Sequence, residues 1–249
     1  MFKYKNKTFI IAEIGNNHEG DFELAKKMIS LAAEAGADAV KFQTFIPEYY
    51  VSSSNHDRIK RLKSFQLSQN EFIKLSKFAL DCKVLFFSTP FDLDSAKFLN
   101  NIQPIFKISS GDNTFYPLID TISNFGKPII ISTGISTTET IDEIYNRILK
   151  IWRENNQEGD LALLHCVPSY PVPIEEANLS KITTMIKKYP QASIGFSDHT
   201  IGVDASLIAL ALGANIIEKH FTLNKKMKGW DHSISANPKE LQIIRDFSK

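Results

Sequence analysis

The stretch IGFSDHTIGVDASLIALALGANIIEKHF, residues 194–221, contains the repeating unit that decides the fold. Two apolar runs, 192–196 and 215–217, flank a helix-like segment at 205–212 that ends at Gly213. This order predicts a strand, a loop, a helix and a second strand. Two strands connected in this way are normally parallel, and parallel strands end at the same edge of their sheet.

Each of these apolar runs is followed by polar residues that include a histidine, His199 after the first and His220 after the second. We therefore expect both imidazoles at one edge of the sheet, with Asp198 and Glu218 close by. Two imidazoles beside carboxylates are typical ligands of a divalent metal ion. A single histidine at a strand end is more often structural, so the assignment depends on the rest of the chain.

The composition is that of a soluble globular protein, with 43% hydrophobic and 23% charged residues. A chain of 249 residues is long enough for two ordinary domains or for one α/β barrel. The formal net charge of +1 provides no field that would hold a nucleic acid or an anionic membrane surface. We therefore predict no nucleic-acid partner and no membrane partner, and expect any anionic ligand to be bound by locally placed cations.

The start of the chain is basic, but its apolar run, residues 9–12, ends at Glu13 and is too short for a signal peptide. No segment approaches the roughly 20 apolar residues of a membrane span. Cys82 and Cys166 lie far apart, each beside an apolar run, which is typical of buried thiols in a reducing compartment. These features predict a cytoplasmic protein.

Alternation of strands and helices continues along the whole chain without a linker. The irregular segment 45–68 is long for a connection, and its SSSNHDRIKRLK sequence predicts either a mobile loop or a short basic helix. The predicted strands are 8–14, 38–44, 83–88, 104–109, 128–132, 161–166, 192–196 and 215–217. The predicted helices are 21–35, 69–81, 92–101, 116–124, 136–154, 176–188, 205–212 and one that begins at Pro238.

Eight strand-helix pairs at this length favour a single closed (β/α)8 TIM barrel over an open doubly wound sheet, both of which belong to the α/β class. The sequence also lacks the Gly-x-Gly-x-x-Gly and phosphate-loop motifs of nucleotide-binding open sheets. In a barrel the chemistry lies at the carboxyl ends of the strands. The residues expected there are Glu13, Lys41, Gln43, Thr89, Lys107, Ser110, Asp112, Ser132, Cys166, Ser197, Asp198, His199, Glu218 and His220.

Lys41 and Lys107 are the most informative of these residues. Taken singly, a lysine can extend its ammonium to solvent and a serine can cap a helix. An ammonium buried at a strand end costs several kcal/mol unless an anion neutralises it. Two such lysines with nearby hydroxyls are suited to a small anion that carries phosphate and carboxylate. With a metal on the histidines, the pattern predicts metal-assisted carbonyl chemistry on a phosphorylated or carboxylated small molecule.

Eight segments resemble the N-acetylneuraminate (sialic acid) synthases and their relatives that make other nonulosonic acids. They cover nearly the whole chain, in order and at the spacing of that family. The segments are IAEIGNNHEG (11–20), VKFQTF (40–45), FFSTPFD (86–92), FKISSGD (106–112), GKPIIISTG (126–134), LLHCVPSYPVP (163–173), IGFSDHT (194–200) and IEKHFT (217–222).

The resemblance implies a role for each matching position. His199 and His220 are the expected ligands of Mn²⁺ or Mg²⁺, and they count with Glu13 as the catalytic residues. Phosphoenolpyruvate and an acylamino sugar are the implied substrates. The residues implied to bind them are Lys41, Thr89, Lys107, Ser110 and Ser132 for phosphoenolpyruvate, and Tyr170, Asp231 and Asp112 for the sugar. Gln43 is also expected among the substrate-binding residues. The family usually has glutamate at the position of Asp112, so that contact is shortened here.

The resemblance also implies a domain that these residues do not include. Family members usually continue into a small antifreeze-like (SAF) C-terminal domain, which covers the active site of the partner in a dimer. We expect residues 1–249 to form the barrel alone, with this domain absent, and a homodimer or a separate lid domain or protein to complete the site. The segment KGWDHSIS, 228–235, also departs from the sialate-forming pattern, which leaves His232 either as a sugar contact or as a solvated side chain.

Three functions remain in view at this stage. The first is a phosphoenolpyruvate-dependent nonulosonate synthase. The second is a related synthase that uses another aldehyde in surface or spore-coat polysaccharide synthesis. The third is a non-catalytic barrel that binds a sugar. The first is favoured because the positions of both the lysine cluster and the metal ligands match the family.

Overall fold

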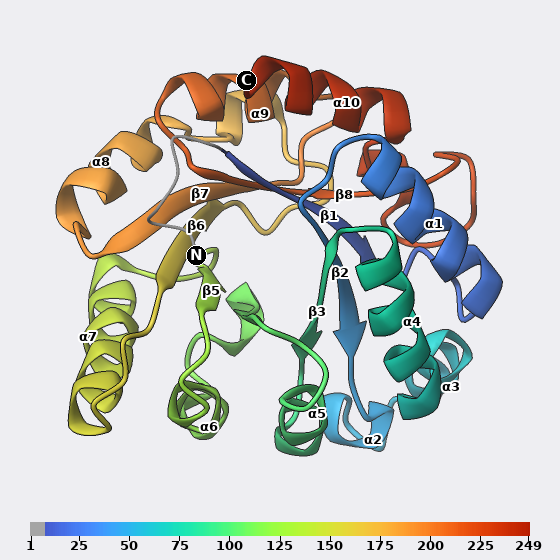
Figure 1. Cartoon of the computed structure of the whole chain (residues 1–249), viewed down its shortest axis with the longest axis horizontal. Helices are drawn as coiled ribbons and strands as arrows, with labels where there is room; N and C mark the ends of the chain where they lie inside the picture. The colour runs from blue at the N-terminus through green and yellow to red at the C-terminus, as the bar shows by residue number, and fades with distance from the viewer. Residues whose placement is uncertain (1–7) are drawn as a thin grey trace.

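The apolar runs of the sequence form strands that are buried on both faces, as expected for a parallel sheet covered by helices. The computed structural model describes residues 8–249, in which eight parallel strands lie inside a layer of helices (Figure 1). The basic start of the chain, considered above as a targeting signal, lies outside the described residues. The predicted (β/α)8 barrel is confirmed.

The strands follow the predicted order. They are β1 (Phe9–Gly15), β2 (Ala39–Thr44), β3 (Leu85–Pro90), β4 (Phe106–Ile108), β5 (Ile129–Ser132), β6 (Leu161–Cys166), β7 (Ala192–Asp198) and β8 (Ile216–His220).

The helices connect these strands and cover the outside of the barrel. They are α1 (Phe22–Glu34), α2 (Pro47–Tyr50), α3 (His56–Phe65), α4 (Gln69–Asp81), α5 (Leu93–Leu99), α6 (Tyr116–Asn124), α7 (Thr138–Glu154), α8 (Ser180–Lys188), α9 (Asp204–Ala211) and α10 (Pro238–Phe247).

The helix starts are encoded locally. Asp21, Asp92 and Thr137 each accept hydrogen bonds from backbone N–H groups in the first turn of α1, α5 and α7. Ser68 and Asn237 form capping boxes with glutamates three residues later. These caps explain why most predicted helix starts lie within two residues of the observed ones.

The first and last strands of the chain are adjacent in the barrel, because β1 pairs with both β2 and β8. Each remaining strand pairs with its neighbour in sequence except across one seam, since no backbone ladder joins β3 to β4 in the described chain. Here the side chain of Gln103 acts as a substitute for a strand. Its Oε1 accepts a hydrogen bond from the Ser88 N–H at 2.7 Å, and its Nε2 donates one to the Ser88 carbonyl at 3.2 Å.

Apolar side chains fill the inside of the barrel only towards the amino ends of the strands. This inner cluster consists of Phe9, Ile11, Ala39, Phe87, Ile105, Ile130, Ala162, Leu164 and Ile216. The larger core lies between the strands and the helices. Polar residues therefore occupy the inward positions at the carboxyl ends, where the candidate site is located.

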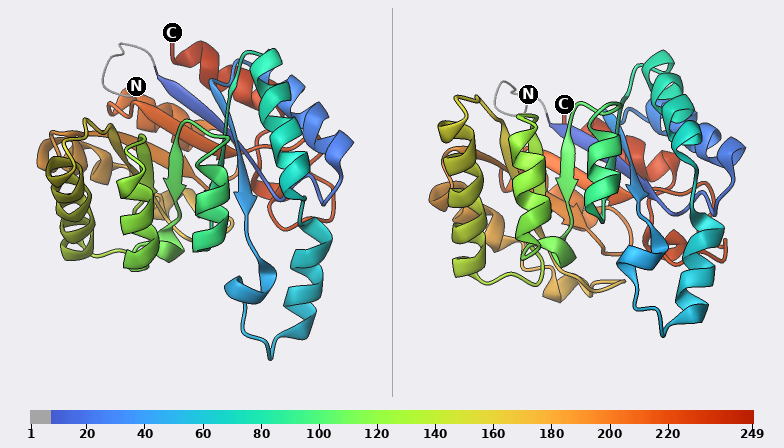
Figure 2. Two further views of the ribbon diagram at one scale, coloured as in Figure 1. Left: turned by 60° about the horizontal axis from the view of Figure 1, so that its bottom comes forward. Right: turned by 90° about the horizontal axis from the view of Figure 1, so that it is seen from below.

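Residues 45–68 form the helices α2 and α3, so the mobile-loop alternative is wrong and the short basic helix is confirmed. Both helices project beyond the strand ends, as the left view of Figure 2 shows. Phe45, Val51 and Leu62 form a small apolar cluster that holds the projection together. Tyr50 packs against Phe91, with ring centroids 4.7 Å apart, and so places an aromatic ring at the barrel mouth.

Strands β7 and β8 extend further than predicted, to Asp198 and His220. The predicted end of each strand was the end of its apolar run, at residues 196 and 217. In the barrel the inward positions near the carboxyl end are polar, so hydrophobicity ends before the strand does. Pairing continues instead, with Glu13 of β1 opposite His220 and Asp198 opposite Lys219.

Across residues 8–249, none of the helices combines the length and the apolar character needed to span a bilayer.

We predict that Gln103→Ala lowers the free energy of unfolding by about 1–3 kcal/mol, because it leaves the N–H and C=O of Ser88 buried without partners. Chemical denaturation would measure the change. Gln191→Ala, at an exposed position just before β7, is the control and should be close to neutral. Equal stabilities of the two variants would contradict the role of Gln103 in closing the seam.

Candidate active site

A pocket of about 340 Å³ occupies the carboxyl end of the barrel, within the size range of small-molecule sites. All but one of the residues given catalytic or binding roles from the sequence contribute to its lining. These are Glu13, Lys41, Gln43, Thr89, Lys107, Ser110, Ser132, Tyr170, His199, His220 and Asp231. They come from almost every strand, which confirms that the strand ends converge on one mouth.

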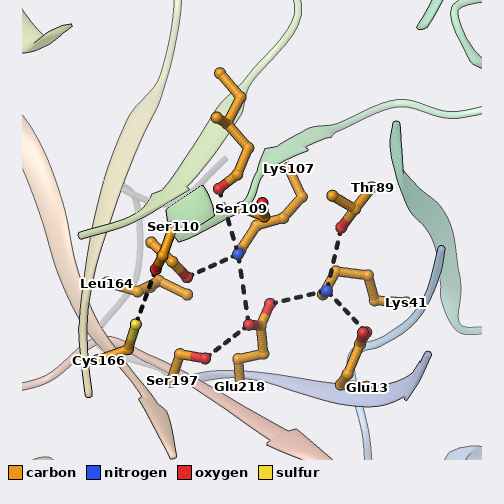
Figure 3. Close-up of polar contacts among 12 residues, drawn as sticks. Glu13, Lys41, Thr89, Lys107, Ser109, Ser110, Leu164, Cys166, Ser197 and Glu218 are labelled. Carbon is orange, nitrogen blue, oxygen red and sulfur yellow. Dashed lines mark hydrogen bonds and ion pairs between the residues drawn. The ribbon is translucent and has the colours of Figure 1, made fainter. Parts of the chain in front are cut away.

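Two buried lysines lie on either side of Glu218 at the floor of the pocket (Figure 3). Lys41 Nζ is 3.6 Å from Glu218 Oε2, and Lys107 Nζ is 3.6 Å from Glu218 Oε1. Lys41 Nζ also lies 2.8 Å from Glu13 Oε2. The side chains of all four residues are at most 6% exposed, so these charges interact with little screening by water.

Hydroxyl groups complete this cluster. Lys107 Nζ donates to Ser132 Oγ at 2.7 Å, and Lys41 Nζ donates to Thr89 Oγ1 at 3.2 Å. Ser197 Oγ donates to Glu218 Oε1 at 2.9 Å. Ser110 lies at the edge, where its Oγ accepts the backbone N–H of Gly134 at 3.0 Å. The arrangement offers ammonium and hydroxyl donors to an anion from three sides.

The four ionisable groups differ in charge at neutral pH. Burial opposes the charge on Glu218, but Lys107 and Lys41 lower the pKa of that carboxyl to about 2. Burial raises the pKa of Glu13 to about 7 despite the neighbouring Lys41. Burial lowers the pKa of Lys107, whereas Glu13 and Glu218 outweigh burial and raise the pKa of Lys41. With one full carboxylate and one partly protonated carboxyl, the two ammoniums leave excess positive charge for an anionic ligand.

Glu13 is positioned by its neighbours on the β1 and β2 side. Gln43 Nε2 lies 3.4 Å from Glu13 Oε1, and Gln43 Oε1 accepts a hydrogen bond from Asn16 Nδ2 at 2.8 Å. Gln43 therefore points its amide N–H toward the carboxylate. Asn16 has no assigned role in the sequence argument, and its importance becomes visible only when the loop after β1 is seen to fold over the end of β2.

His199 and His220 face each other across the end of β7 and β8, with ring centroids 5.5 Å apart. His199 Nδ1 lies 2.9 Å from the carbonyl of Val167, which can only accept, so Nδ1 carries the proton. The lone pair is then on Nε2, which the Tyr170 hydroxyl approaches at 3.1 Å. This tautomer leaves a ring nitrogen in the pocket that is able to bind a metal ion.

His220 has a buried Nδ1 that makes no hydrogen bond within residues 8–249, and the nearby carboxylate oxygen of Asp231 is 3.8 Å away. Burial and the charge of His220 lower the pKa of His199 to about 4, and burial and Lys41 lower that of His220 to about 3. Both rings are thus neutral at pH 7, as metal ligation requires. The donors fit a divalent ion bound by two imidazoles.

No cluster of three or more histidine, cysteine or acidic side chains with metal-site geometry is present in the described part of the chain. A metal held by His199 and His220 would therefore take its other ligands from water and substrate. This donor set is typical of an ion that must remain open to a reacting molecule.

Two of the three sugar contacts implied by the resemblance, Tyr170 and Asp231, lie beside the histidines. The Tyr170 ring stacks at 4.1 Å from the His199 ring, and its side chain is half-exposed at the mouth. Asp112 is the exception among the predicted residues, because it does not line the pocket. Its carboxylate accepts a hydrogen bond from Ser109. Burial raises the pKa of the Tyr50 phenol, and the charge of Asp112 adds to that effect.

His232 is neither a sugar contact nor a solvated side chain. It is buried, with Nδ1 2.7 Å from Thr222 Oγ1 and Nε2 3.2 Å from Glu19 Oε1. It therefore connects the loop after β8 to the loop after β1. Six lining residues had no role assigned from the sequence, namely Tyr50, Phe91, Ser109, Gly111, Ile135 and Pro168. The long segment 45–68 was a signal for Tyr50, whereas a single exposed isoleucine carries none.

Comparison with known proteins agrees with this geometry. The N,N'-diacetyllegionaminic acid synthase of Campylobacter jejuni is 41% identical over 252 residues, which cover 96% of this chain and 74% of that protein. The crystal structure of the N-acetylneuraminic acid synthetase of Leptospira borgpetersenii, in complex with citrate, has a TM-score of 0.90 at 38% identity, covering 98% and 83% of the two chains.

The spore coat polysaccharide biosynthesis protein SpsE of Bacillus subtilis, also a crystal structure, has a TM-score of 0.86 at 36% identity, covering 98% of this chain and 68% of that one. The model of the NeuB family matches residues 28–248, which include every strand except β1. The chain belongs to the NeuB family.

Proposed function

We propose that the protein is a phosphoenolpyruvate-dependent synthase. It would join phosphoenolpyruvate to an acylamino sugar of the N-acetylmannosamine type and release a sialic acid-like nonulosonic acid and inorganic phosphate. The observation that carries the proposal is the pair of buried ammoniums, Lys41 and Lys107, beside the two neutral imidazoles in one pocket. Few small molecules other than a phosphorylated carboxylate and a carbonyl compound suit that combination.

Phosphoenolpyruvate would bind at the lysine cluster. Its phosphate and carboxylate supply the negative charge that the excess of ammonium over carboxylate requires. Hydroxyls of Ser132, Thr89 and Ser110 would orient it, since each lies at the rim of the cluster. Gln43 would keep the Glu13 carboxyl directed at the reacting carbons.

The metal would be Mn²⁺ or Mg²⁺, and His199 and His220 would hold it. When bound, it supplies Lewis-acid polarisation of the sugar aldehyde. The Val167 carbonyl fixes the tautomer of His199, so that Nε2 presents its lone pair. Tyr170 and Asp231, both beside the imidazoles, would hold the acylamino part of the sugar.

The bond changes would follow from this placement. C3 of phosphoenolpyruvate forms a bond to the aldehyde carbon, and the aldehyde oxygen takes up a proton. The positive charge that develops at C2 is quenched by water, which loses a proton. The resulting tetrahedral carbon carries a hydroxyl and the phosphate ester; its C–O bond to the phosphate breaks, the hydroxyl proton leaves with the phosphate, and C2 becomes the 2-keto group of the product. Lys107 and Lys41 would stabilise the leaving phosphate, and Glu13 would accept the proton of the water.

The choice of aldose carries a second candidate. The similarity to SpsE supports a related synthase that acts on another aldehyde in surface or spore-coat polysaccharide synthesis. Asp112, which the resemblance implies as a sugar contact, lies outside the pocket lining and accepts a hydrogen bond from Ser109, which supports a different aldose for this chain. We also propose that the protein is cytoplasmic. We propose further that it acts as a homodimer or with a separate lid, and the half-exposed Tyr170 at the mouth supports this second proposal.

We predict that the protein releases inorganic phosphate from phosphoenolpyruvate only when Mn²⁺ and a suitable 2-acetamido aldose are both present. A panel of such aldoses and of simple aldoses, followed by a colorimetric phosphate assay, would separate the two synthases. Release with simple aldoses alone would favour the second candidate. Absence of release with every sugar would favour a barrel that only binds sugar.

His220→Ala should abolish metal-dependent turnover while the thermal unfolding midpoint stays within a few degrees. Changes to outer-shell partners of metal ligands already cost about 10–100-fold, so the loss on removing a ligand should be at least about 100-fold. His56→Ala, at an exposed position on α3, is the matched control and should keep full activity. Retained turnover in the His220 variant would remove this residue from the metal site.

The raised pKa of Glu13 predicts a pH dependence. Below about pH 7 this carboxyl is protonated and cannot accept a proton, so kcat should fall as the pH decreases through about 7. Glu13→Gln should lower kcat and remove this acidic limb from the profile, while phosphoenolpyruvate still binds at the two lysines. Measuring kcat from pH 5.5 to 9 for both proteins tests the assignment. An unchanged acidic limb in the variant would show that another group is the base.

A further inference from the structure

A buried ion pair lies directly behind the two histidines, on the side of the strands that faces away from the pocket. Asp198 is the last residue of β7, and Lys219 is the penultimate residue of β8. Their side chains are completely buried, and Lys219 Nζ lies 3.1 Å from Asp198 Oδ2. Neither residue lines the pocket, and the proposed reaction makes no use of either one.

The pair crosses the junction between the two strands that carry the histidines. Asp198 and Lys219 are opposite each other in the parallel ladder. Successive side chains of a strand alternate between its two faces, so the inward His220 is preceded by the outward Lys219. His199 likewise follows Asp198 directly in sequence. Each member of the ion pair is thus the covalent neighbour of one proposed metal ligand.

The same two side chains also hold the residue after His199. Asp198 Oδ1 accepts hydrogen bonds from Thr200 N and Thr200 Oγ1, both at 2.8 Å. Lys219 Nζ donates to the Thr200 carbonyl at 2.6 Å. His199 therefore lies between two residues whose positions are both fixed. Ser206 Oγ of α9 donates to Asp198 Oδ2 at 2.6 Å and connects the helix to the same group.

Stability alone is a weak reason for such a pair. Removing two charges from water is costly, and apolar residues of similar volume are often as stable at a buried position. What the pair provides, and apolar residues would not, is directional hydrogen bonds at defined points. These bonds fix the relative position of the ends of β7 and β8, which sets the separation of the two imidazoles.

We infer that Asp198 and Lys219 are positioning residues that hold His199 and His220 at the spacing a divalent metal ion requires. The inference rests on the metal site in the proposed function. It predicts that neutralising the pair weakens metal binding while the lysine cluster on β2 and β4 continues to bind phosphoenolpyruvate.

The test uses the double variant Asp198→Asn with Lys219→Met, which removes both charges together and leaves neither one buried alone. Mn²⁺ binding to the full chain would be measured by isothermal titration calorimetry without substrates, and the bound ion by its electron paramagnetic resonance spectrum. We expect the dissociation constant to rise about 10–100-fold and the spectrum to change. Phosphoenolpyruvate affinity, measured without metal, should change less than about threefold.

The control variant is Asp38→Asn with Arg245→Met. It removes a second largely buried ion pair, which joins α10 to the amino end of the barrel. It should lower the unfolding temperature as well but leave Mn²⁺ affinity unchanged. Equal losses of Mn²⁺ affinity in the two double variants would mean that lower stability, rather than positioning, weakens binding, and would overturn the inference.

Two further results separate this inference from the proposed function. If the wild-type chain binds no Mn²⁺, the metal site and the inference both fail. If the wild type binds Mn²⁺ and the Asp198/Lys219 variant binds it equally well, only the inference fails. Should that variant not fold, Ser206→Ala decides, because it removes a single hydrogen bond to Asp198 and keeps both charges. Unchanged Mn²⁺ affinity and an unchanged spectrum in that variant would then overturn the inference.

Discussion

The charge balance between Lys41, Lys107 and Glu218 is the constraint on which the site depends. Two ammoniums cannot be kept this deep in a barrel without a carboxylate, and a second fully charged carboxylate would leave nothing for a ligand to neutralise. Glu218 contributes one charge shared between both lysines, at 3.6 Å from each. Glu13, whose pKa is about 7, is partly ionised at neutral pH and neutralises part of the remaining positive charge. The excess positive charge at the barrel mouth is thus the charge that the proposed anionic substrate would neutralise.

This arrangement requires a particular division of the barrel interior. The inner apolar cluster occupies the amino half, so the strands are held together there without help from the site. At the carboxyl half, inward positions are given to charged and hydroxyl residues, and hydrogen bonds on the outer face replace hydrophobic packing, as at Asp198 and Thr200. At the β3–β4 seam, the Gln103 side chain hydrogen-bonds to the N–H and the carbonyl of Ser88. Side-chain hydrogen bonds therefore also replace missing contacts between strands at this point of the barrel.

Much of this was predictable from the sequence, because the fold follows from local signals that repeat. The limits of β6, α4 and α6 agree with the prediction to the residue. The apolar run coincides with β6, the Ser68 capping box marks the start of α4, and Pro117 lies in the first turn of α6. The ends of β7 and β8 were placed too early, because inward polar residues interrupt hydrophobicity. His232 was misjudged, and the position of Asp112 outside the pocket lining was not foreseen, because their partners, Glu19 and Ser109, follow from loop packing, which leaves no periodic pattern.

For the two histidines, the sequence predicts the location but not the protonation state of the rings. Their convergence followed from the parallel connection of two strands, and the 5.5 Å between the ring centroids agrees with it. The tautomer of His199 did not follow, because it depends on the carbonyl of Val167 in the irregular segment after β6. A metal ligand is defined by its lone pair as well as by its location. For the two proposed metal ligands, the strand order determines the location, and contacts from distant loops and from the outer face of the sheet determine the orientation.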